Sequence, residues 1–374
     1  MKVFILTTVM APYRVQLFSE IGKQCELYVC FEQMHSFERN KRWYDKSSAN
    51  FQLIELEKWD KSIKTIKLEV IKHIRNINPD VVIAYEYHTN TSIMLMSYCQ
   101  VMKIPYIVNC DGAFISKSIK DIVKRWFISK ASGCISSGKM ADKYLTHYGA
   151  LKENIYYNHF TSLYNKDILK YPPTLEDKQF IKKKRKILHN QVILSVGRFV
   201  HMKGYDILLK AAANFSEEVG IYIIGGQITS EYKKLVKELN LKNIYFIDFM
   251  TKEELKEYYL AADVFVLPTR EDVWGLVINE AMSYALPIVT TERCVAGIEM
   301  IENGVNGFIV PVENYEDLYY ATKKILVNRN LRENMAIENL KSIREYTYEI
   351  SAIDIISAIK SVYESAYKKK KDLF

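Results

Sequence analysis

Three carboxylates flank a Trp-Gly pair in the segment 269–282, which reads TREDVWGLVINEAM. Glu271 and Asp272 precede the pair, and Glu280 lies in the apolar run that follows it. Carboxylates accept hydrogen bonds from the vicinal hydroxyls of a sugar. The alternative is that Asp272 only caps a helix and Glu280 is solvated.

A helix is expected to begin at the glycine of this segment. The first backbone N–H groups of a helix have no intrahelical acceptors, and they form a natural binding site for phosphate. Here those groups belong to Gly275, Leu276 and Val277. One segment thus offers backbone amides that bind phosphate and carboxylates that bind sugar hydroxyls. This combination predicts a nucleotide-sugar site.

Two cations occur in the segment 195–211, SVGRFVHMKGYDILLKA. Arg198 follows a strand-like run, and Lys203 precedes a helix-like run that begins near Gly204. An arginine fork and a lysine point charge together suit a diphosphate. The alternative is two surface cations, although a cation is slightly unfavourable at a helix N-terminus.

Short β-rich runs alternate with amphipathic helical runs almost throughout the chain. This alternation predicts an α/β fold with parallel sheets, in which ligands bind beyond the carboxyl ends of the strands. Pro172-Pro173 and the charged run 177–190 interrupt the pattern, so a linker is expected around residues 163–190. The predicted domains are 1–165 and 166–346, with a C-terminal helix at 347–374 that packs back on the first.

The first domain offers polar residues at expected strand ends. Asp111 follows PYIVNC, and Glu86 and His88 follow DVVIAY, while Arg14 lies near the start of the first helix. The alternatives are that Asp111 is a turn residue before glycine and that Glu86 and His88 are solvated at the surface. His88 has no partner at metal-ligand spacing.

The excess positive charge lies in the first half of the chain. The formal net charge is +8, and residues 1–165 carry 22 Lys and Arg against 15 Asp and Glu. A basic amphipathic helix is expected at 116–130, where Ile119, Ile122, Val123 and Trp126 share one face. That face is expected to pack on the domain core, and the basic face makes an anionic membrane surface a candidate partner. A solvated lysine-rich surface is the alternative.

The sequence gives little support to a membrane-spanning, metal-binding or nucleic-acid-binding protein. No run approaches the length of a spanning helix. The six cysteines have no metal-ligand spacing and are interpreted as reduced core residues of a cytoplasmic protein. No nucleic-acid-binding module is recognised, so nucleic acid is not an expected partner.

The segment from Asp272 to Glu280 resembles the E-x7-E motif of the GT4 family of retaining glycosyltransferases, which have the GT-B fold. The runs VGRFVHMKG, AADVFVLPT and AGIEMIENGVNGFIVP are similar to further family segments. The resemblance covers most of the chain and is strongest from about 191 to 315. It implies two Rossmann-like domains that face each other across a cleft.

The resemblance also implies roles for the residues of the second domain. Arg198 and Lys203 would hold the diphosphate of a UDP-sugar, and Glu280 would bind the ribose. Asp272 would contact the donor sugar beside the amides of Gly275, Leu276 and Val277. Phe249 and Met250 would lie over the uracil. The family usually has Glu where this chain has Asp272, which places the identity of the sugar in doubt.

In the first domain, the resemblance implies that Asp111 contacts the donor sugar or assists the acceptor hydroxyl. Glu86 and His88 are candidates for acceptor contacts. Many family members carry Gly-Gly in the first strand–helix turn, where this chain has Ala11-Pro12-Tyr13-Arg14. Arg14 is therefore a candidate diphosphate ligand, with a surface residue as the alternative.

The predicted activity is transfer of a sugar from UDP to a hydroxyl of a glycan or lipid-linked glycan in cell-surface polysaccharide biosynthesis. The family needs no cofactor or bound metal, and the chain has no DxD signature. The expected location is cytoplasmic, with peripheral attachment to the inner face of the cell membrane as a candidate. A UDP-sugar epimerase and a non-catalytic nucleotide-sugar-binding subunit are the alternatives.

Overall fold

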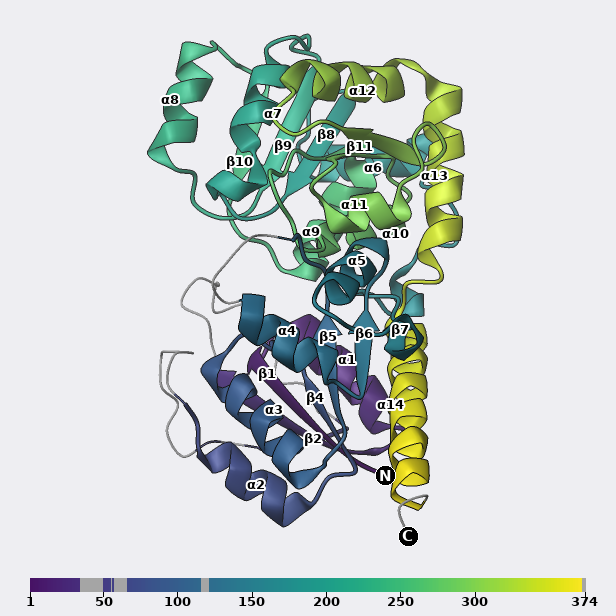
Figure 1. Ribbon diagram of the computed structural model, residues 1–374. Helices are drawn as coiled ribbons and strands as arrows, with labels where there is room; N and C mark the ends of the chain where they lie inside the picture. The colour runs from purple at the N-terminus through teal and green to yellow at the C-terminus, as the bar shows by residue number, and fades with distance from the viewer. Residues whose placement is uncertain (34–49, 55, 57–65, 116–120, 372–374) are drawn as a thin grey trace. The chain divides into compact units, whose positions relative to one another are not determined.

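The chain forms two compact units (Figure 1). The computed structural model describes residues 1–33, 50–54, 56, 66–115 and 121–371. Unit 1 contains Met1–Thr161 and Thr347–Phe374, and unit 2 contains Ser162–Tyr346. The first boundary lies a few residues before the expected position at 165/166. The expected linker at 163–190 belongs to unit 2 and contains helix α6 (Leu175–Lys184).

Unit 1 is built on a parallel seven-stranded sheet with the strand order β3-β2-β1-β4-β5-β6-β7. Its strands are β1 (Lys2–Val9), β2 (Glu26–Gln33), β3 (Gln52–Ile54), β4 (Val81–Ala84), β5 (Tyr106–Cys110), β6 (Gly133–Ser136) and β7 (Ile155–Tyr157). The register of β1 pairs Phe4 with Tyr28 on one side and with Val82 on the other. The central strands are buried on both faces, as their continuous apolar runs predict.

Helices connect these strands and cover the sheet of unit 1. They are α1 (Pro12–Gly22), α2 (Glu69–Ile77), α3 (Asn90–Met102), α4 (Asp121–Ser129), α5 (Lys139–His147) and α14 (Tyr348–Lys371). Pro12 occupies the first turn of α1, where its missing N–H is tolerated. The C-terminal helix α14 packs against α1. Its Asp354 carboxylate lies 2.8 Å from Nδ1 of His159, which fastens α14 to the chain just after β7.

Unit 2 is built on a parallel six-stranded sheet with the order β10-β9-β8-β11-β12-β13. Its strands are β8 (Gln191–Val196), β9 (Val219–Ile224), β10 (Ile244–Ile247), β11 (Val264–Leu267), β12 (Ile288–Thr291) and β13 (Gly307–Val310). Besides α6, its helices are α7 (Tyr205–Ala212), α8 (Ser230–Glu238), α9 (Lys252–Ala261), α10 (Leu276–Ser283), α11 (Val295–Met300), α12 (Tyr315–Val327) and α13 (Arg329–Ile343). Two parallel sheets confirm the predicted α/β class.

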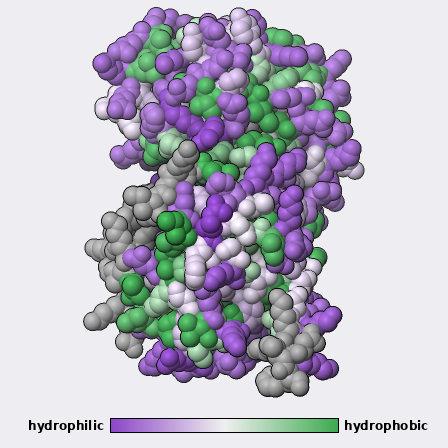
Figure 2. All heavy atoms as spheres, viewed as in Figure 1, coloured by the Kyte–Doolittle hydropathy of each residue, from purple (hydrophilic) through white to green (hydrophobic). Residues whose placement is uncertain are grey.

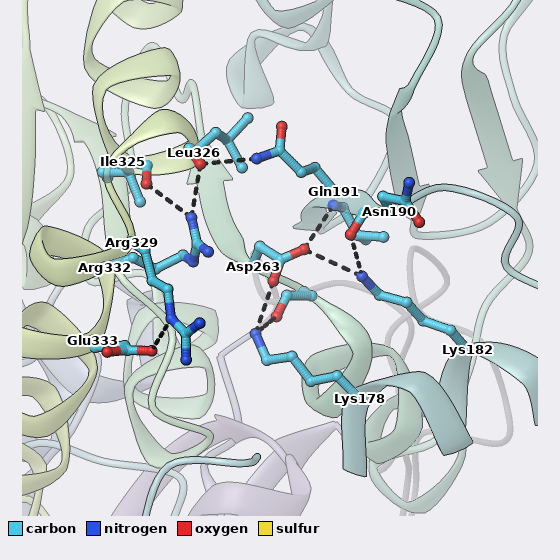
Figure 3. Close-up of polar contacts among 12 residues, drawn as sticks. Lys178, Lys182, Asn190, Gln191, Asp263, Ile325, Leu326, Arg329, Arg332 and Glu333 are labelled. Atoms are coloured by element: carbon cyan, nitrogen blue, oxygen red, sulfur yellow. Dashed lines mark hydrogen bonds and ion pairs between the residues drawn. The ribbon is translucent and has the colours of Figure 1, made fainter. Parts of the chain in front are cut away.

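Buried polar contacts close the amino-terminal edge of the unit 2 sheet (Figure 3). Asp263, just before β11, accepts hydrogen bonds from Lys178 at 2.9 Å and Lys182 at 3.3 Å, both from α6. A third bond comes from the backbone N–H of Val192 at 3.0 Å. Burial opposes the charge on Asp263, but the two lysines outweigh it and lower its pKa. Ligands of open parallel sheets bind beyond the opposite, carboxyl edge.

The apolar face of α4 corrects an expectation. Ile122 is 78% exposed and Trp126 is 52% exposed, whereas Phe127 and Ile128 are buried. The face of Ile122, Val123 and Trp126 therefore does not pack on the core of unit 1, because the neighbouring Phe127 and Ile128 do so. Figure 2 shows hydrophobic side chains at the surface where α4 begins. Residues 116–120 of the expected helix, which include Ile119, lie outside the described part of the chain.

The cysteines behave as predicted core residues. All six are free thiols, and all but Cys25 are buried. Burial raises the pKa of Cys99 and of Cys134 to about 12, so these thiols stay protonated. None of the helices in the described ranges is long and apolar enough to cross a membrane.

Candidate active site

The strand order of unit 2 defines one point on the carboxyl edge where a ligand crevice is expected. The chain runs outward from β8 through β9 to β10, and then from β11 through β12 to β13 on the other side. The loops after the neighbouring strands β8 and β11 therefore leave in opposite directions. Such a switch point is the usual ligand site of an open parallel sheet.

A glycine brings the two loops together at this switch point. Gly204, between the turn His201–Lys203 and α7, has a positive φ of 66°. A Cβ on this residue would lie 2.0 Å from the carbonyl oxygen of Pro268, so only glycine fits. The contact is reinforced by Arg270, whose backbone N–H donates a hydrogen bond to the backbone carbonyl of Met202 at 2.7 Å. Lys203 is thereby held beside the loop that follows β11.

Arg270 has a structural role in the same loop. Its guanidinium forms two hydrogen bonds to Asp206, at 2.8 and 2.7 Å, and a further one to Glu313 at 2.8 Å. The hydrogen bonds that Arg270 donates to Asp206, and the one that it donates to Glu313, outweigh partial burial and raise the pKa of Arg270. The arginine therefore joins the start of α7 to the loops after β11 and β13.

The acidic loop after β11 is pinned to the loop after β12. The backbone N–H of Asp272 donates to the carbonyl of Arg293 at 2.9 Å, and Val295 donates to the carbonyl of Asp272 at 3.1 Å. Gly275 precedes α10 with a φ of 99°, and a Cβ there would lie 2.9 Å from Sγ of Cys294. This glycine lets α10 begin against the β12 loop, with Leu276 and Val277 in its first turn.

The two adjacent acids have different partners. Asp272 forms an ion pair with Lys203 through its Oδ2 atom, and Glu271 forms one with Arg293. The structure thus brings together Lys203 and Asp272, which lie 69 positions apart in the chain. Arg293 was not predicted as a site residue, because no local pattern links it to the acidic loop.

Glu280 lies in a polar niche inside unit 2. Its Oε2 atom accepts a 3.0 Å hydrogen bond from the Tyr259 hydroxyl, and its Oε1 atom lies 3.4 Å from Oγ of Ser162. Burial raises the pKa of Glu280, although the charge of Lys252 and the two hydroxyl donors act in the opposite direction. These contacts exclude the alternative of a plainly solvated Glu280. Neither Tyr259 nor Ser162 carried a signal in the sequence.

The remaining predicted residues of unit 2 lie along the same carboxyl edge. Arg198 follows β8 after Gly197 and is partly buried. Phe249 and Met250 follow β10, at the edge of the sheet, and both are partly buried. Backbone hydrogen bonds from Gly197 to Ile224 and from Gly225 to Ile247 extend the strand ladder toward them.

In unit 1 the structure joins three residues that are far apart in the sequence. Arg14 donates through Nη2 to Glu86 at 2.7 Å and to Asp111 at 3.0 Å. Its side chain is 9% exposed, and its guanidinium lies 4.7 Å from the ring centre of Tyr85. Burial opposes the charge of Arg14, but attraction to Glu86 in particular raises its pKa above the ordinary value. The alternative of a surface Arg14 is therefore wrong.

This cluster occupies the switch point of the unit 1 sheet, between β1 and β4. Glu86 also accepts a hydrogen bond from the backbone N–H of Thr8 at 2.8 Å, and Asp111 accepts one from Asn109 at 2.6 Å. The acids are therefore fixed by groups from β1, α1 and β5. His88 lies in the turn before α3 and is exposed, with its ring edge-on to Tyr87.

No group of three or more His, Cys, Asp or Glu residues within the described ranges is arranged to hold a metal ion.

Comparisons with known proteins place this geometry in a family. Residues 177–342 match the model of the family Glycosyl transferases group 1. An uncharacterized 41.2 kDa protein in the cps region of Klebsiella pneumoniae is 27% identical over 278 residues, which are 70% of this chain and 71% of that protein. The amylovoran biosynthesis glycosyltransferase AmsK of Erwinia amylovora is 32% identical over 150 residues, which are 37% of this chain and 36% of AmsK.

The fold has a counterpart among solved structures. Anabaena HepE in complex with UDP aligns with a TM-score of 0.74 at 15% identity, over 98% of this chain and 100% of HepE. AmsK and six further curated relatives are each matched over about half of their length or less. The family match lies within unit 2, which contains the acidic loop and its glycines. Unit 2 thus contains a domain of the group 1 (GT4) family of glycosyltransferases, and the chain has the GT-B fold.

Proposed function

We propose that the protein is a retaining glycosyltransferase that moves a sugar from a UDP-sugar to a hydroxyl of a glycan or lipid-linked glycan. The observation that carries this proposal is the convergence of Lys203, Asp272 and the N-terminus of α10 at the switch point of unit 2. UDP as the leaving group is supported by the HepE complex, which contains UDP. A role in cell-surface polysaccharide biosynthesis is supported by the similarity to AmsK, which is named as a glycosyltransferase of amylovoran biosynthesis.

Each part of the donor has a proposed partner in unit 2. Arg198 and Lys203 hold the diphosphate together with the N–H groups of α10 at Gly275, Leu276 and Val277. The positive charges and the helix N-terminus stabilise the negative charge that develops on the leaving diphosphate.

The nucleoside and the sugar use other residues. Glu280 accepts hydrogen bonds from the ribose hydroxyls, and Tyr259 holds its carboxylate in place. Phe249 and Met250 cover the uracil. Asp272 accepts hydrogen bonds from hydroxyls of the donor sugar.

The proposed acceptor side is the cluster of unit 1. Asp111 contacts the donor sugar or the acceptor hydroxyl, and Glu86 and His88 contact the acceptor. Arg14 is already engaged by two carboxylates, so its proposed role changes from a diphosphate ligand to a residue that positions Glu86 and Asp111. No metal takes part in this proposal.

An anionic membrane surface is the proposed docking partner for a lipid-linked acceptor. The exposed face of Ile122, Val123 and Trp126 borders the exposed cations Arg125 and Lys130. Nζ of Lys130 lies 3.3 Å from the ring centre of Trp126. An amphipathic helix with an aromatic apolar face and cations beside it binds membrane interfaces. The proposed location is the cytoplasm, at the inner face of the cell membrane.

A screen for UDP release over a panel of UDP-sugars, with lipid extract as the acceptor, tests the proposed activity. Acceptor-dependent UDP release with one donor supports the transferase. Interconversion of two UDP-sugars without UDP release would indicate an epimerase instead. Binding of UDP-sugars without any turnover would indicate a binding subunit.

A further inference from the structure

The ion pair between Lys203 and Asp272 joins two residues that the proposed function gives to different parts of the donor. Lys203 is assigned to the diphosphate and Asp272 to the sugar, yet they bind each other here. Their side chains are 18% and 14% exposed, so the pair lies at the surface of the site without being fully solvated. The ammonium group of Lys203 therefore has two competing anionic partners, which are the Asp272 carboxylate and the diphosphate of the donor.

The surrounding contacts leave Asp272 as the acid that Lys203 faces. Glu271 is paired with Arg293, and Asp206 is paired with Arg270. The backbone of Asp272 is fixed by its two hydrogen bonds to the β12 loop, and Gly275 lies close to its carboxylate. The backbone of Lys203 is fixed by its bond to Val200 at 2.9 Å. Exchange of partners therefore requires only rotation of the two side chains.

We propose that donor binding exchanges this ion pair, an inference that rests on the proposed function. Lys203 transfers its hydrogen bonds from Asp272 to the diphosphate, and the released carboxylate accepts hydrogen bonds from the hydroxyls of the sugar. A UDP-sugar supplies a new partner for both residues. UDP alone supplies one only for Lys203 and leaves Asp272 without a cation next to the bound anion.

The exchange makes Asp272 a residue that distinguishes the donor from the product. While the sugar is present, the carboxylate is satisfied by hydroxyl groups. After transfer, the carboxylate competes with UDP for Lys203 and weakens the binding of the product. Asp272 therefore favours UDP release in addition to its contact with the sugar.

Calorimetric titration with UDP tests the exchange. The proteins are the wild type, Asp272→Asn, Lys203→Ala and the double variant. Because Asp272→Asn frees Lys203, we expect it to bind UDP about three- to tenfold more tightly than the wild type. In the Lys203→Ala background the same substitution should leave UDP affinity unchanged within about twofold.

Glu271→Gln is the matched control, because it removes one negative charge from the neighbouring position without touching Lys203. We expect a change in UDP affinity of less than about twofold, since this charge is paired with Arg293. Asp272→Ser provides a second variant should Asp272→Asn fail to fold, and circular dichroism spectra establish the folded state of each protein. For the donor identified by the screen, Asp272→Asn should reduce the ratio of the affinity for the UDP-sugar to the affinity for UDP.

Two results would overturn the exchange while the proposed function stands. One is unchanged or weaker UDP binding by both Asp272 variants, and the other is an equal gain with and without Lys203. A wild type and variants that all fail to bind UDP would overturn the proposed UDP dependence together with the exchange.

Discussion

At the scale of single residues, Arg14 holds two acids from distant parts of unit 1. The guanidinium contacts Glu86 and Asp111, which follow β4 and β5, and it is almost fully buried. Removing one member of a buried charge cluster leaves the others uncompensated, which is usually more destabilising than losing a surface pair. Arg14 therefore combines a positioning role at the site with a contribution to the stability of unit 1.

Arg14→Ala should lower the free energy of unfolding of unit 1 by about 3 kcal/mol, because Glu86 and Asp111 lose their shared cation. Urea denaturation followed by circular dichroism measures this change. Arg75→Ala is the control, since Arg75 is an exposed cation on α2 and contacts Tyr98 only at the surface. Equal stability of the two variants would show that the Arg14 cluster contributes nothing beyond a surface charge.

Glu280→Gln should weaken the binding of UDP and UMP by a similar factor, about tenfold, because the proposed contact is to the ribose. Burial raises the pKa of Glu280, so its ionised form is lost at a higher pH than that of an exposed glutamate. As the pH is lowered, the ratio of nucleotide affinity between the wild type and Glu280→Gln should therefore fall at a higher pH than that at which exposed carboxylates titrate.

Calorimetry with both nucleotides at several pH values measures the Glu280 effect. The titration of the ligand is common to both proteins and cancels in the ratio. A loss seen with UDP but not with UMP would move Glu280 from the ribose to the distal part of the donor.

At the scale of elements, α6 is fastened to the amino edge of the unit 2 sheet by the pair of lysines on Asp263 (Figure 3). The capping box of Thr174 and Asp177 begins α6 within the segment that was expected to be a linker. The helix therefore depends on a local cap at its start and on a distant buried acid along its length.

Asp263→Asn should destabilise unit 2 by about 3 kcal/mol at pH 7, because it leaves Lys178 without its buried partner. The folded-state pKa of Asp263 is lowered, so its contribution is complete above the unfolded pKa of about 4 and is lost as the pH falls through the folded pKa. The difference between wild type and variant should therefore shrink at strongly acidic pH.

Urea denaturation of both proteins at pH 7 and at decreasing pH tests the Asp263 prediction. Glu333→Gln is the matched control, because Glu333 forms an exposed pair with Arg329 in the same region of unit 2. A difference between wild type and Asp263→Asn that does not change with pH would exclude the ion pair as its source.

At the scale of the whole molecule, the uneven distribution of charge bears on membrane attachment. The excess of cations in residues 1–165 belongs to the part of the chain that contains the exposed face of α4. Each Lys or Arg near an anionic leaflet contributes roughly 1 kcal/mol, and the attraction fades within a Debye length. A few engaged cations together with Trp126 give reversible attachment.

The protein should sediment with anionic liposomes at low salt, remain in solution with neutral ones, and be released by added salt. Trp126→Ser combined with Arg125→Glu should reduce the bound fraction severalfold, and UDP affinity should remain as in the wild type. Tyr320→Ser combined with Lys210→Glu is the matched control, since both residues are exposed in unit 2. Equal recovery with neutral and anionic liposomes would make the α4 face a solvated surface.

Much of the fold was predictable from hydrophobic periodicity. The apolar runs before Arg198, Asp111 and Glu86 were recognised as strands, and each lies in β8, β5 or β4. The three-residue strands β3 and β7 were missed, because such short edge strands have little periodic signal. The expectation that the α4 face packs on the core is wrong for a different reason, because a helical repeat marks an apolar face but does not identify what covers it.

The sequence alone determined the α/β class, the family and the residue types available at the strand ends, because these depend on local pattern and motif. Only the tertiary structure decided which of those residues meet. Arg14 with Asp111, Lys203 with Asp272, and Tyr259 with Glu280 are separated by 97, 69 and 21 positions. The first two pairs meet because the order of the parallel strands places the residues that follow those strands at one edge. The third pair joins helices α9 and α10. Strand order and helix packing are long-range properties that no local spacing records.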